Sequence, residues 1–463
     1  MVKEKRNLVT IDDMSNDEIE SLFLLADEMY KALDKQSNTC SGRIMATLFY
    51  EPSTRTRLSF ESAMLRLGGS VISSANMDSS SAVKGESLAD TIRVVSGYAD
   101  IIVLRHPLEG AAKVAADYAR VPVINAGDGG HEHPTQTLCD LYTLRKEKGT
   151  IKGLTVALWG DLKYGRTIHS LSYALARFGA DIISIPVEGL EMPDHVTDKL
   201  RSEYNYYIET ARFDDIPSMM GKVDAVYMNP SRPHQLSLLQ AEKLSSSQIH
   251  NPKKETNIDA LYLTRVQKER HPTNESADKS YSRIDLKALR GPRLKDTLVM
   301  HPLPRVDELP YEVDEEPRSI YFKQAAYGVP VRMALTAFLL GIKNINIPEE
   351  VLSPAPIMDY PLYKRDTGIR CSNLNCISTH ETTYIKPEFK IVSIGPLVLR
   401  CVYCDCEQYP SYIASSEWHQ GTLENKRCHS ASSHLIHKIK PENLLIFNSQ
   451  SEAEAYGFKP GKF

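Results

Sequence analysis

The sequence predicts an α/β protein with two parallel-sheet domains and a small β-rich domain near the C-terminal end. Short apolar segments alternate with helical segments up to about residue 145, and the alternation resumes at Gly153. Such alternation is typical of parallel sheets with helices on their faces. Six of the eight cysteines lie after residue 370, so the last part of the chain is expected to fold separately. A chain of 463 residues can hold two or three domains.

The composition argues against a nucleic-acid-binding or membrane protein. Charged residues make up 25% of the chain and the formal net charge is −4, so there is no basic excess to attract nucleic acid. The apolar run Met333–Ile342 is too short to span a bilayer. The first residues lead into polar sequence and not into an apolar signal segment. We therefore expect a cytoplasmic protein with no nucleic-acid partner and no membrane partner.

The first predicted domain covers residues 1–148. Four apolar segments in it have the length and composition of buried strands, with helices between them: Ile44–Tyr50, Ser70–Ser74, Ile101–Arg105 and Val121–Asn125. We expect a helix at about residues 325–345 to return to this domain and complete it.

The second predicted domain covers residues 149–324. It opens with the strand Gly153–Gly160, continues with a helix from about Thr167 to Phe178, and then has the strand Asp181–Pro186. Two near-copies, Val223–Met228 and Ile258–Leu263, are separated by a polar stretch. A polar interval of this length inside a compact domain indicates an insertion, which we place at about residues 229–257.

Anion-binding groups are concentrated in the turn Glu51–Arg57. Three hydroxyls and two guanidinium groups lie within Ser53–Arg57, between a strand and a helix expected at Leu58–Leu67. A strand–turn–helix aims free N–H groups and the positive end of the helix dipole at one point. Hydroxyl and guanidinium donors at that point make a strong oxyanion site. The alternative is an ordinary helix cap with surface arginines, and the density of donors favours the oxyanion site.

The cysteines near the C-terminal end have the spacing of a metal site. Cys371 and Cys376 form one clip, and Cys401 and Cys404 form a second. Two such clips of thiolates are typical of one structural, tetrahedral Zn²⁺, and their local clustering argues against a disulfide framework. We expect one zinc ion per chain, with Cys406 as a spare thiol. A proline-rich linker at residues 349–369 precedes this zinc domain, which we place at residues 370–410.

Seven motifs in a fixed order resemble the catalytic chain of the aspartate carbamoyltransferase family over residues 5–345. They are Ser53–Arg57, Ser80–Asp90, Val103–Pro107, His133–Asp140, Gly160–Arg166, Thr264–Arg270 and Met300–Asp307. The resemblance implies the carbamoyltransferase fold, with the site between the two domains. It also implies transfer of the carbamoyl group of carbamoyl phosphate to L-aspartate, an early step of pyrimidine synthesis.

The nearest alternative is the ornithine carbamoyltransferase family, which shares the Ser53–Arg57 signature. That family has a Cys where this chain has Leu303, and it lacks an equivalent of Thr264–Arg270. A substrate with two carboxylates needs additional cations, which Arg166 and Arg265 supply, so aspartate is favoured. A non-catalytic regulatory paralogue is the other alternative, and the intact set of donors argues against it.

The resemblance also implies a role for each site residue. Ser53, Thr54, Arg55 and Thr56 would hold the phosphate, while Thr56, Arg105 and His133 would polarise the carbonyl oxygen. Gln136 would accept from the carbamoyl NH₂ group, together with the backbone carbonyls of Pro302 and Leu303. The residues implied for aspartate are Lys84, Arg166, Arg265 and Gln267. No catalytic cofactor is implied.

In the family a serine and a lysine come from a neighbouring subunit, which implies a homotrimer with shared active sites and leaves larger assemblies open. The lysine corresponds to Lys84 and the serine to Ser80, with Ser81 as the alternative. Taken alone, Lys84 would be read as a solvated surface charge.

Four other site residues have simpler explanations. His133 could simply cap the helix that follows it. Arg105 and Arg166 could each form an ion pair with a purely structural role. Arg265 competes with Lys268 and Arg270 for its role in binding aspartate.

The tail carries two further resemblances. Cys371–Ser378 is similar to the zinc domain of the aspartate carbamoyltransferase regulatory chain, which implies a fusion of two normally separate chains. The nucleotide-binding domain of that chain has no counterpart here, so control by nucleotides is not expected. Residues 411–463 resemble a small Ada-type metal-binding module that has lost half of its ligands, so we expect them to fold without metal.

Overall fold

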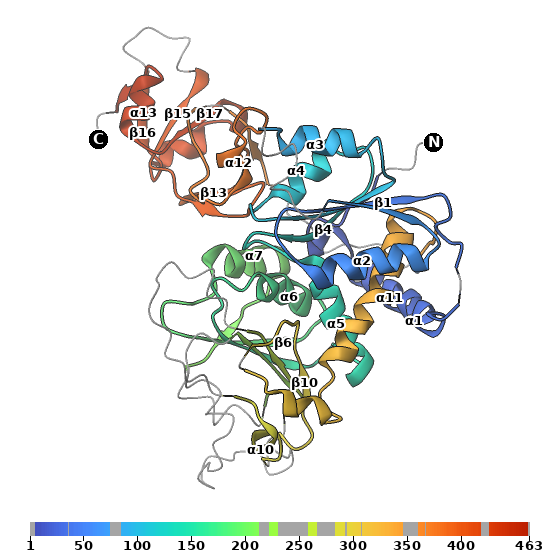
Figure 1. Ribbon diagram of the computed structural model, residues 1–463. Helices are drawn as coiled ribbons and strands as arrows, with labels where there is room; N and C mark the ends of the chain where they lie inside the picture. The colour runs from blue at the N-terminus through green and yellow to red at the C-terminus, as the bar shows by residue number, and fades with distance from the viewer. Residues whose placement is uncertain are drawn as a thin grey trace, which may run out of the picture.

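The computed structural model describes residues 5–35, 37–74, 85–212, 222–229, 258–265, 283–291, 294–306, 308–345, 360–365, 367–417 and 426–461. Figure 1 shows two α/β domains, one above the other, with the C-terminal tail beside the first domain. Within these residues no helix is long and apolar enough to cross a membrane.

The first domain has a four-stranded parallel sheet in the order β2-β1-β3-β4. Its strands confirm the four predicted ones, although β4 begins two residues later than expected: β1 (Ile44–Phe49), β2 (Ser70–Ser74), β3 (Ile101–His106) and β4 (Val123–Asp128). The helices around the sheet are α1 (Asn16–Lys31), α2 (Thr54–Arg66), α3 (Leu88–Val95), α4 (Ala111–Tyr118) and α5 (Pro134–Lys148). A short 3₁₀ helix, η1 (Ile11–Asp13), precedes them.

The second domain has a six-stranded parallel sheet in the order β10-β9-β8-β5-β6-β7. Its strands are β5 (Thr155–Gly160), β6 (Asp181–Pro186), β7 (Glu209–Thr210), β8 (Ala225–Asn229), β9 (Ala260–Leu263) and β10 (Leu298–Met300). Its helices are α6 (Arg166–Arg177), α7 (Asp194–Tyr204) and α10 (Leu286–Leu289), with the 3₁₀ helix η7 (Tyr311–Glu315). The two near-copies of the sequence form the neighbouring strands β8 and β9. Of the predicted insertion, only Asn229 is described, and it belongs to β8.

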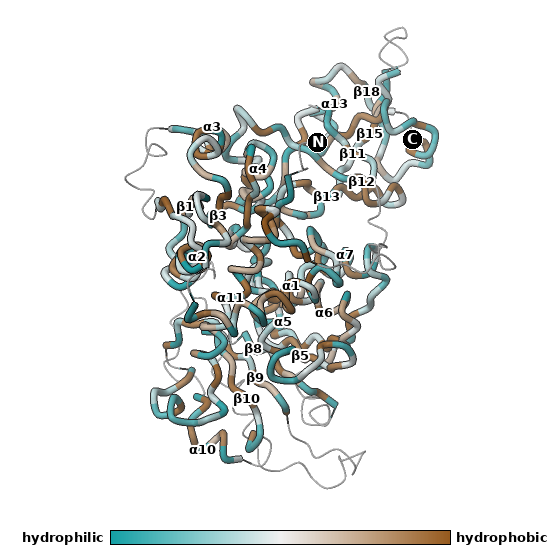
Figure 2. The backbone as a smooth tube through the Cα atoms, turned by 90° about the vertical axis from the view of Figure 1, so that its right-hand side faces the viewer, coloured by the Kyte–Doolittle hydropathy of each residue, from teal (hydrophilic) through white to brown (hydrophobic). Residues whose placement is uncertain are grey.

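Helix α11 (Tyr321–Leu339) leads from the second domain back to the first and begins four residues before the position expected from the sequence. It packs against α1, α2 and α5. One apolar core runs through both domains and includes Leu138 of α5, Ile168 of α6 and Val331 of α11. Figure 2 shows α1, α5 and α11 together in the middle of the molecule. Buried helices therefore join the two domains through a shared apolar core.

The tail contains two small sheets. The first is antiparallel and consists of β11 (Leu362–Tyr363), β12 (Phe389–Ile394), β13 (Leu397–Cys401) and β14 (Glu407–Gln408). The second has the order β17-β15-β16-β18 and consists of β15 (Tyr412–Ser415), β16 (Arg427–Ser430), β17 (Leu444–Phe447) and β18 (Lys459–Pro460). The helices are α12 (Ile377–His380), α13 (Gln450–Ala455), η11 (His434–Lys438) and η12 (Pro441–Asn443). Because β11 pairs with β12, the tail begins inside the stretch that was predicted to be linker.

The tail docks on the first domain through backbone and side-chain contacts around Glu109. The Glu109 N–H donates to the Asn375 carbonyl and the Ile377 N–H donates to the Glu109 carbonyl, both at 2.9 Å. The Asn373 amide donates to the Glu109 carboxylate at 2.7 Å. Apolar side chains of both parts share one core, so the tail forms a continuous unit with the first domain.

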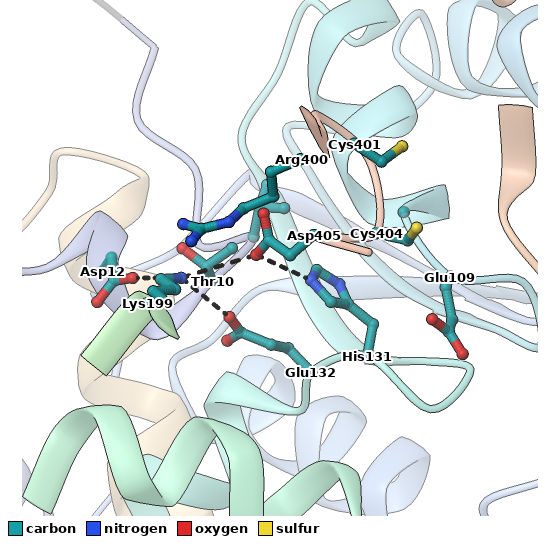
Figure 3. Close-up of polar contacts among 12 residues, drawn as sticks. Thr10, Asp12, Glu109, His131, Glu132, Lys199, Arg400, Cys401, Cys404 and Asp405 are labelled. Atoms are coloured by element: carbon teal, nitrogen blue, oxygen red, sulfur yellow. Dashed lines mark hydrogen bonds and ion pairs between the residues drawn. The ribbon is translucent and has the colours of Figure 1, made fainter. Parts of the chain in front are cut away.

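A buried cluster of charges joins the tail to both α/β domains (Figure 3). Asp405 of the tail lies 3.3 Å from His131 of the first domain and 3.7 Å from the Lys199 ammonium of α7. Lys199 also contacts Asp12 at 2.8 Å. Burial alone would raise the pKa of Asp405, but Lys199 and His131 hold it well below its usual range, so this carboxylate is ionised. Three parts of the chain therefore meet at one ammonium group.

Replacing Lys199 by Met should destabilise the protein strongly, because it leaves buried carboxylates without their cation. Removing one partner of a buried ion pair costs about 3–5 kcal/mol. The measurement is denaturant unfolding of the Lys199→Met variant, with the exposed Lys152→Met as the matched control. The control should change stability by no more than about 0.5 kcal/mol. Equal stability of the two variants would show that the cluster does not hold the three parts together.

Candidate active site

A cleft of about 430 Å³ lies between the two α/β domains. Both domains line it, since it is bounded by the turn after β1, by the start of α6 and by the loop after β10. The predicted site residues that line it are Ser53, Thr54, Arg55, Thr56, Arg105, His133, Gln136, Arg166, Arg265, Pro302 and Leu303. Residues that are far apart in the sequence therefore meet in one place.

The start of α2 forms one wall of the cleft. The helix begins at Thr54, four residues before the predicted Leu58, so the hydroxyls and Arg55 belong to its first turn. Ser53 occupies the N-cap position, and its side chain makes no capping hydrogen bond. The first N–H groups of a helix lack intrahelical acceptors, and the dipole adds positive charge there. The N–H groups of the first turn of α2 are thus available to bind an anion, and the hydroxyls and Arg55 belong to this turn and not to a loop before it.

The loop after β10 is fixed opposite this helix end. Arg55 donates to the Leu303 carbonyl at 2.7 Å, and Leu303 has a φ of 56°, which is uncommon for a residue with a side chain. The Leu303 N–H donates to Nδ1 of His301 at 2.8 Å. His301 must therefore carry its proton on Nε2, which contacts Glu308 at 2.9 Å. Burial lowers the pKa of His301, in agreement with a neutral ring that positions the loop.

Glu51 lies between two arginines of the cleft, and the sequence analysis assigned it no role. Its carboxylate accepts from Arg105 at 2.7 Å and from Arg166 at 3.3 Å. Arg105 comes from the end of β3 and Arg166 from the start of α6, so one carboxylate pairs with cations from both domains. A Cβ atom on Gly127, whose φ is 113°, would lie 3.0 Å from Arg105 and 3.3 Å from Arg166. Glycine at this position therefore lets the two guanidinium groups approach the backbone.

Ion pairing and helix capping do not fully account for Arg105, Arg166 and His133. Arg105 and Arg166 do form ion pairs, but their partner Glu51 itself lines the cleft. His133 is at the N-cap of α5 and makes no side-chain capping hydrogen bond, so capping alone does not explain it. Arg265 lies near enough to Arg55 to lower its pKa, an effect that adds to the larger effect of burial.

Three predicted residues lie outside the described part of the chain: Ser80, Lys84 and Gln267. In contrast, the cleft contains several residues that the sequence analysis missed, including Gln324 and Arg332 of α11. Arg332 is buried and donates to Ser59 of α2 at 3.0 Å. The sequence gives little indication of these residues. A polar residue in an apolar helix indicates only that it has a polar neighbour, and not which one.

The four predicted cysteine ligands form a second, separate site. The sulfurs of Cys371 and Cys404 are 3.5 Å apart, and those of Cys376 and Cys401 are 3.8 Å apart. Four sulfurs about 2.3 Å from a tetrahedral centre would be about 3.8 Å from one another. All four side chains are buried, and their sulfurs lie within 4.8 Å of one another. The donor set therefore fits a single tetrahedral metal ion, and Cys406 is outside it.

Three stretches of the chain match known protein families. Residues 6–146 match "Aspartate/ornithine carbamoyltransferase, carbamoyl-P binding domain" and residues 230–339 match "Aspartate/ornithine carbamoyltransferase, Asp/Orn binding domain". Residues 366–412 match "Aspartate carbamoyltransferase regulatory chain, metal binding domain".

Individual relatives match 72–73% of this chain. The aspartate carbamoyltransferase catalytic subunit of Thermoplasma acidophilum is 46% identical over 343 residues, which are 73% of this chain and 99% of that protein. The solved catalytic subunit of M. jannaschii aspartate transcarbamoylase is 44% identical, with a TM-score of 0.57 over 73% of this chain and 98% of that one. The Trypanosoma cruzi enzyme, solved with N-(phosphonacetyl)-L-aspartic acid, is 35% identical, with a TM-score of 0.57 over 72% and 95%.

Substitution of one cysteine in the tail should abolish metal binding. Cys401→Ser removes one of the four clustered sulfurs, and a structural site with three thiolates loses most of its affinity. Cys406→Ser is the matched control, because this thiol is close in sequence but outside the cluster. Metal content of the purified proteins should be about one ion per chain in the wild type and in the control. A stoichiometric metal ion retained in Cys401→Ser would refute the ligand assignment.

Proposed function

The chain belongs to the aspartate carbamoyltransferase family, and from this membership we propose how its residues transfer the carbamoyl group of carbamoyl phosphate to the amino group of L-aspartate. The products are N-carbamoyl-L-aspartate and phosphate. The observation that carries the proposal is the convergence of an uncapped helix end and cations from both domains on one cleft.

The phosphate end of carbamoyl phosphate binds at the start of α2. Ser53, Thr54 and Thr56 supply hydroxyl donors there, and Arg55 supplies a guanidinium group. Charge-assisted hydrogen bonds from such groups are about twice as strong as neutral ones. The same donors stabilise the phosphate as it leaves, because its charge increases when the bond to the carbonyl carbon breaks.

The carbonyl oxygen binds near the C-terminal end of β3, the start of α5 and the first turn of α2. Thr56, Arg105 and His133 line the cleft there and donate to the oxygen as negative charge develops on it. Gln136 accepts from the carbamoyl NH₂ group, together with the backbone carbonyls of Pro302 and Leu303. The Leu303 carbonyl accepts from Arg55 in this structure, so the Arg55 side chain would shift when substrate binds.

L-Aspartate binds on the side of the second domain. Its two carboxylates need two cations, and Arg166 and Arg265 are the arginines that this domain contributes to the cleft. Gln267 and Lys84 belong to the same proposal. Ornithine would place an ammonium group among these arginines, and like charges at such distances repel. The relatives named above are aspartate enzymes, which favours aspartate over the ornithine alternative.

Glu51 acts as a counter-charge that the substrates displace. It pairs with Arg105 and Arg166 in this structure. A phosphate dianion and a substrate carboxylate carry more negative charge than one glutamate, so they would draw both arginines away. Substrate binding would thus exchange Glu51 for the anionic groups of the substrates.

The assembly is a homotrimer in which Ser80 and Lys84 reach the site of a neighbouring subunit. The support is the family resemblance of Ser80–Asp90 alone, and assemblies larger than the trimer remain compatible with it. The enzyme would act in the cytoplasm, in de novo synthesis of UMP.

The metal of the tail is Zn²⁺ with a structural role. The separation of the four sulfurs and the match to a metal-binding domain support it. The ion would fold the tail that docks on the first domain, in a single chain that combines catalytic and regulatory-chain-like parts. Residues 411–463 are predicted to fold without metal.

Assays with the two amino acids test the function directly. The purified protein should form carbamoyl aspartate from carbamoyl phosphate and aspartate, and no citrulline from ornithine. Arg55→Ala should lower kcat/KM by about 10²–10³-fold, as expected when a donor to a developing anion is lost. Arg57→Ala is the matched control, because this neighbouring arginine is outside the cleft. Citrulline formation, or no turnover with either amino acid, would overturn the proposal.

Subunit exchange tests the shared sites. Arg55→Ala and Lys84→Ala trimers should each be nearly inactive. Mixed trimers should regain activity, because some sites then combine an intact Arg55 with an intact Lys84 from the neighbour. Hybrids whose exchange is proven by mass spectrometry and that remain inactive would show that Lys84 does not act across the interface.

A further inference from the structure

We propose that Asp140 is a positioning residue that makes the site selective for the NH₂ group of carbamoyl phosphate. It does so by holding Gln136 with its amide oxygen toward the cleft. This inference rests on the proposed function, and it assigns a role to a buried carboxylate that the mechanism above does not use.

Asp140 accepts hydrogen bonds from three elements of the structure. It lies one turn after Gln136 on α5 and is only 2% exposed. Its carboxylate accepts from the Gln136 amide at 2.8 Å and from the Gln324 amide of α11 at 3.0 Å. The Tyr262 hydroxyl of β9 donates to the other carboxylate oxygen at 3.1 Å. A single buried group thus collects donors from both α/β domains.

The direction of these hydrogen bonds is fixed from outside the cluster. The backbone N–H of His301 lies 3.0 Å from Oε1 of Gln324. A backbone N–H can only donate, so the oxygen of Gln324 faces His301 and its NH₂ group faces Asp140. Asp140 must therefore act as an acceptor toward Gln324. Above its pKa the Asp140 carboxylate is ionised and has only acceptor atoms, so Gln136 also presents its NH₂ group to Asp140.

The consequence for the cleft follows from the geometry of an amide. Gln136 lines the cleft, and its NH₂ group is engaged by Asp140, so the oxygen is the end that remains for substrate. An oxygen acceptor binds the NH₂ group of carbamoyl phosphate. Acetyl phosphate has nearly the same shape but carries a methyl group there, so it would leave that buried acceptor unpaired. Sites built around such a hydrogen bond discriminate strongly against analogues that lack it.

The second domain contributes to the same network. Tyr262 stacks on Tyr227 of β8 with ring centroids 4.2 Å apart. The Tyr227 hydroxyl is hydrogen-bonded at 2.8 Å to Thr167 of α6, which lines the cleft. Asp140 is therefore held by groups that move with the second domain, and its position depends on how the two domains are packed.

The test compares the two phosphates in the wild type and in Asp140→Asn. Acetyl phosphate is used as a competitive inhibitor against carbamoyl phosphate. The quantity compared is a ratio, the inhibition constant of acetyl phosphate divided by the KM of carbamoyl phosphate. Asparagine keeps the shape but removes the charge. Its amide oxygen must face the NH₂ group of Gln324, so it accepts from Gln136 only through a weaker, neutral hydrogen bond, and Gln136 can turn its NH₂ group to the cleft. The ratio should fall by about tenfold, or about 1.4 kcal/mol, which is the difference between a hydrogen bond to a charged acceptor and one to a neutral acceptor. Tyr262→Phe is the matched control, because it removes one donor and leaves both amides in place, and its ratio should stay near that of the wild type.

A pH series on the wild type keeps the test informative even if Asp140→Asn does not fold. Burial raises the pKa of Asp140 to about 7, against the effect of its hydrogen-bond donors and of Arg332. The titratable or charged groups near it are Arg332, Cys139, Tyr262 and Tyr227, and the amides of Gln136 and Gln324 also face it. Below pH 7 it becomes protonated and can donate, so the ratio should be lower at pH 6 than at pH 8. Titration of the phosphate affects both ligands alike and cancels in the ratio.

Two outcomes would overturn the proposal. Equal loss of affinity for both phosphates in Asp140→Asn would mean that Asp140 only supports the fold. A ratio independent of pH in the wild type would show that its ionisation does not orient Gln136. Failure of the proposed function is distinguishable from both, because the wild type would then neither turn over carbamoyl phosphate nor be inhibited by acetyl phosphate.

Discussion

The carboxylate of Glu51 holds together a site that would otherwise consist of mutually repelling cations. Arg105 comes from the first domain and Arg166 from the second, and both pair with Glu51. Two unit charges 4 Å apart at the edge of a protein interact by about 4 kcal/mol, so a cleft lined with unpaired arginines would push the domains apart. In the proposed mechanism this counter-charge lets the cleft form without substrate, and substrate binding exchanges one anion for another.

The tail also connects the two α/β domains, through a second set of ion pairs away from the cleft. Its Asp405 contacts Lys199 of the second domain and His131 of the first. Arg400 of the tail also pairs with Glu203 of α7 at 2.7 Å. Arg400 and Asp405 lie next to Cys401 and Cys404 of the four-cysteine cluster. The candidate metal site of the tail is thus adjacent to charges that contact the second domain.

Most of the first domain and the candidate anion site could be predicted, because they depend on residues that are close together in the sequence. The turn after β1 could be read directly, because its hydroxyls and Arg55 act within one helical turn. Glu51 lies just before the first turn of α2, but its partners Arg105 and Arg166 come from β3 and α6. Only the folded structure brings these elements close to Glu51. Asp140 was missed for the same reason, since its partners come from α5, α11 and β9. Local chemistry is visible in a sequence, whereas networks that span several elements are not.

The most direct test of this account is a crystal structure of the protein with N-(phosphonacetyl)-L-aspartate, which combines a phosphonate and the aspartate carboxylates in one ligand. The account predicts the phosphonate at the first turn of α2, against Ser53, Thr54 and Thr56. It also predicts that Arg105 and Arg166 turn from Glu51 to the ligand. A ligand bound away from this helix end, or one that leaves both arginines on Glu51, would contradict the central claim.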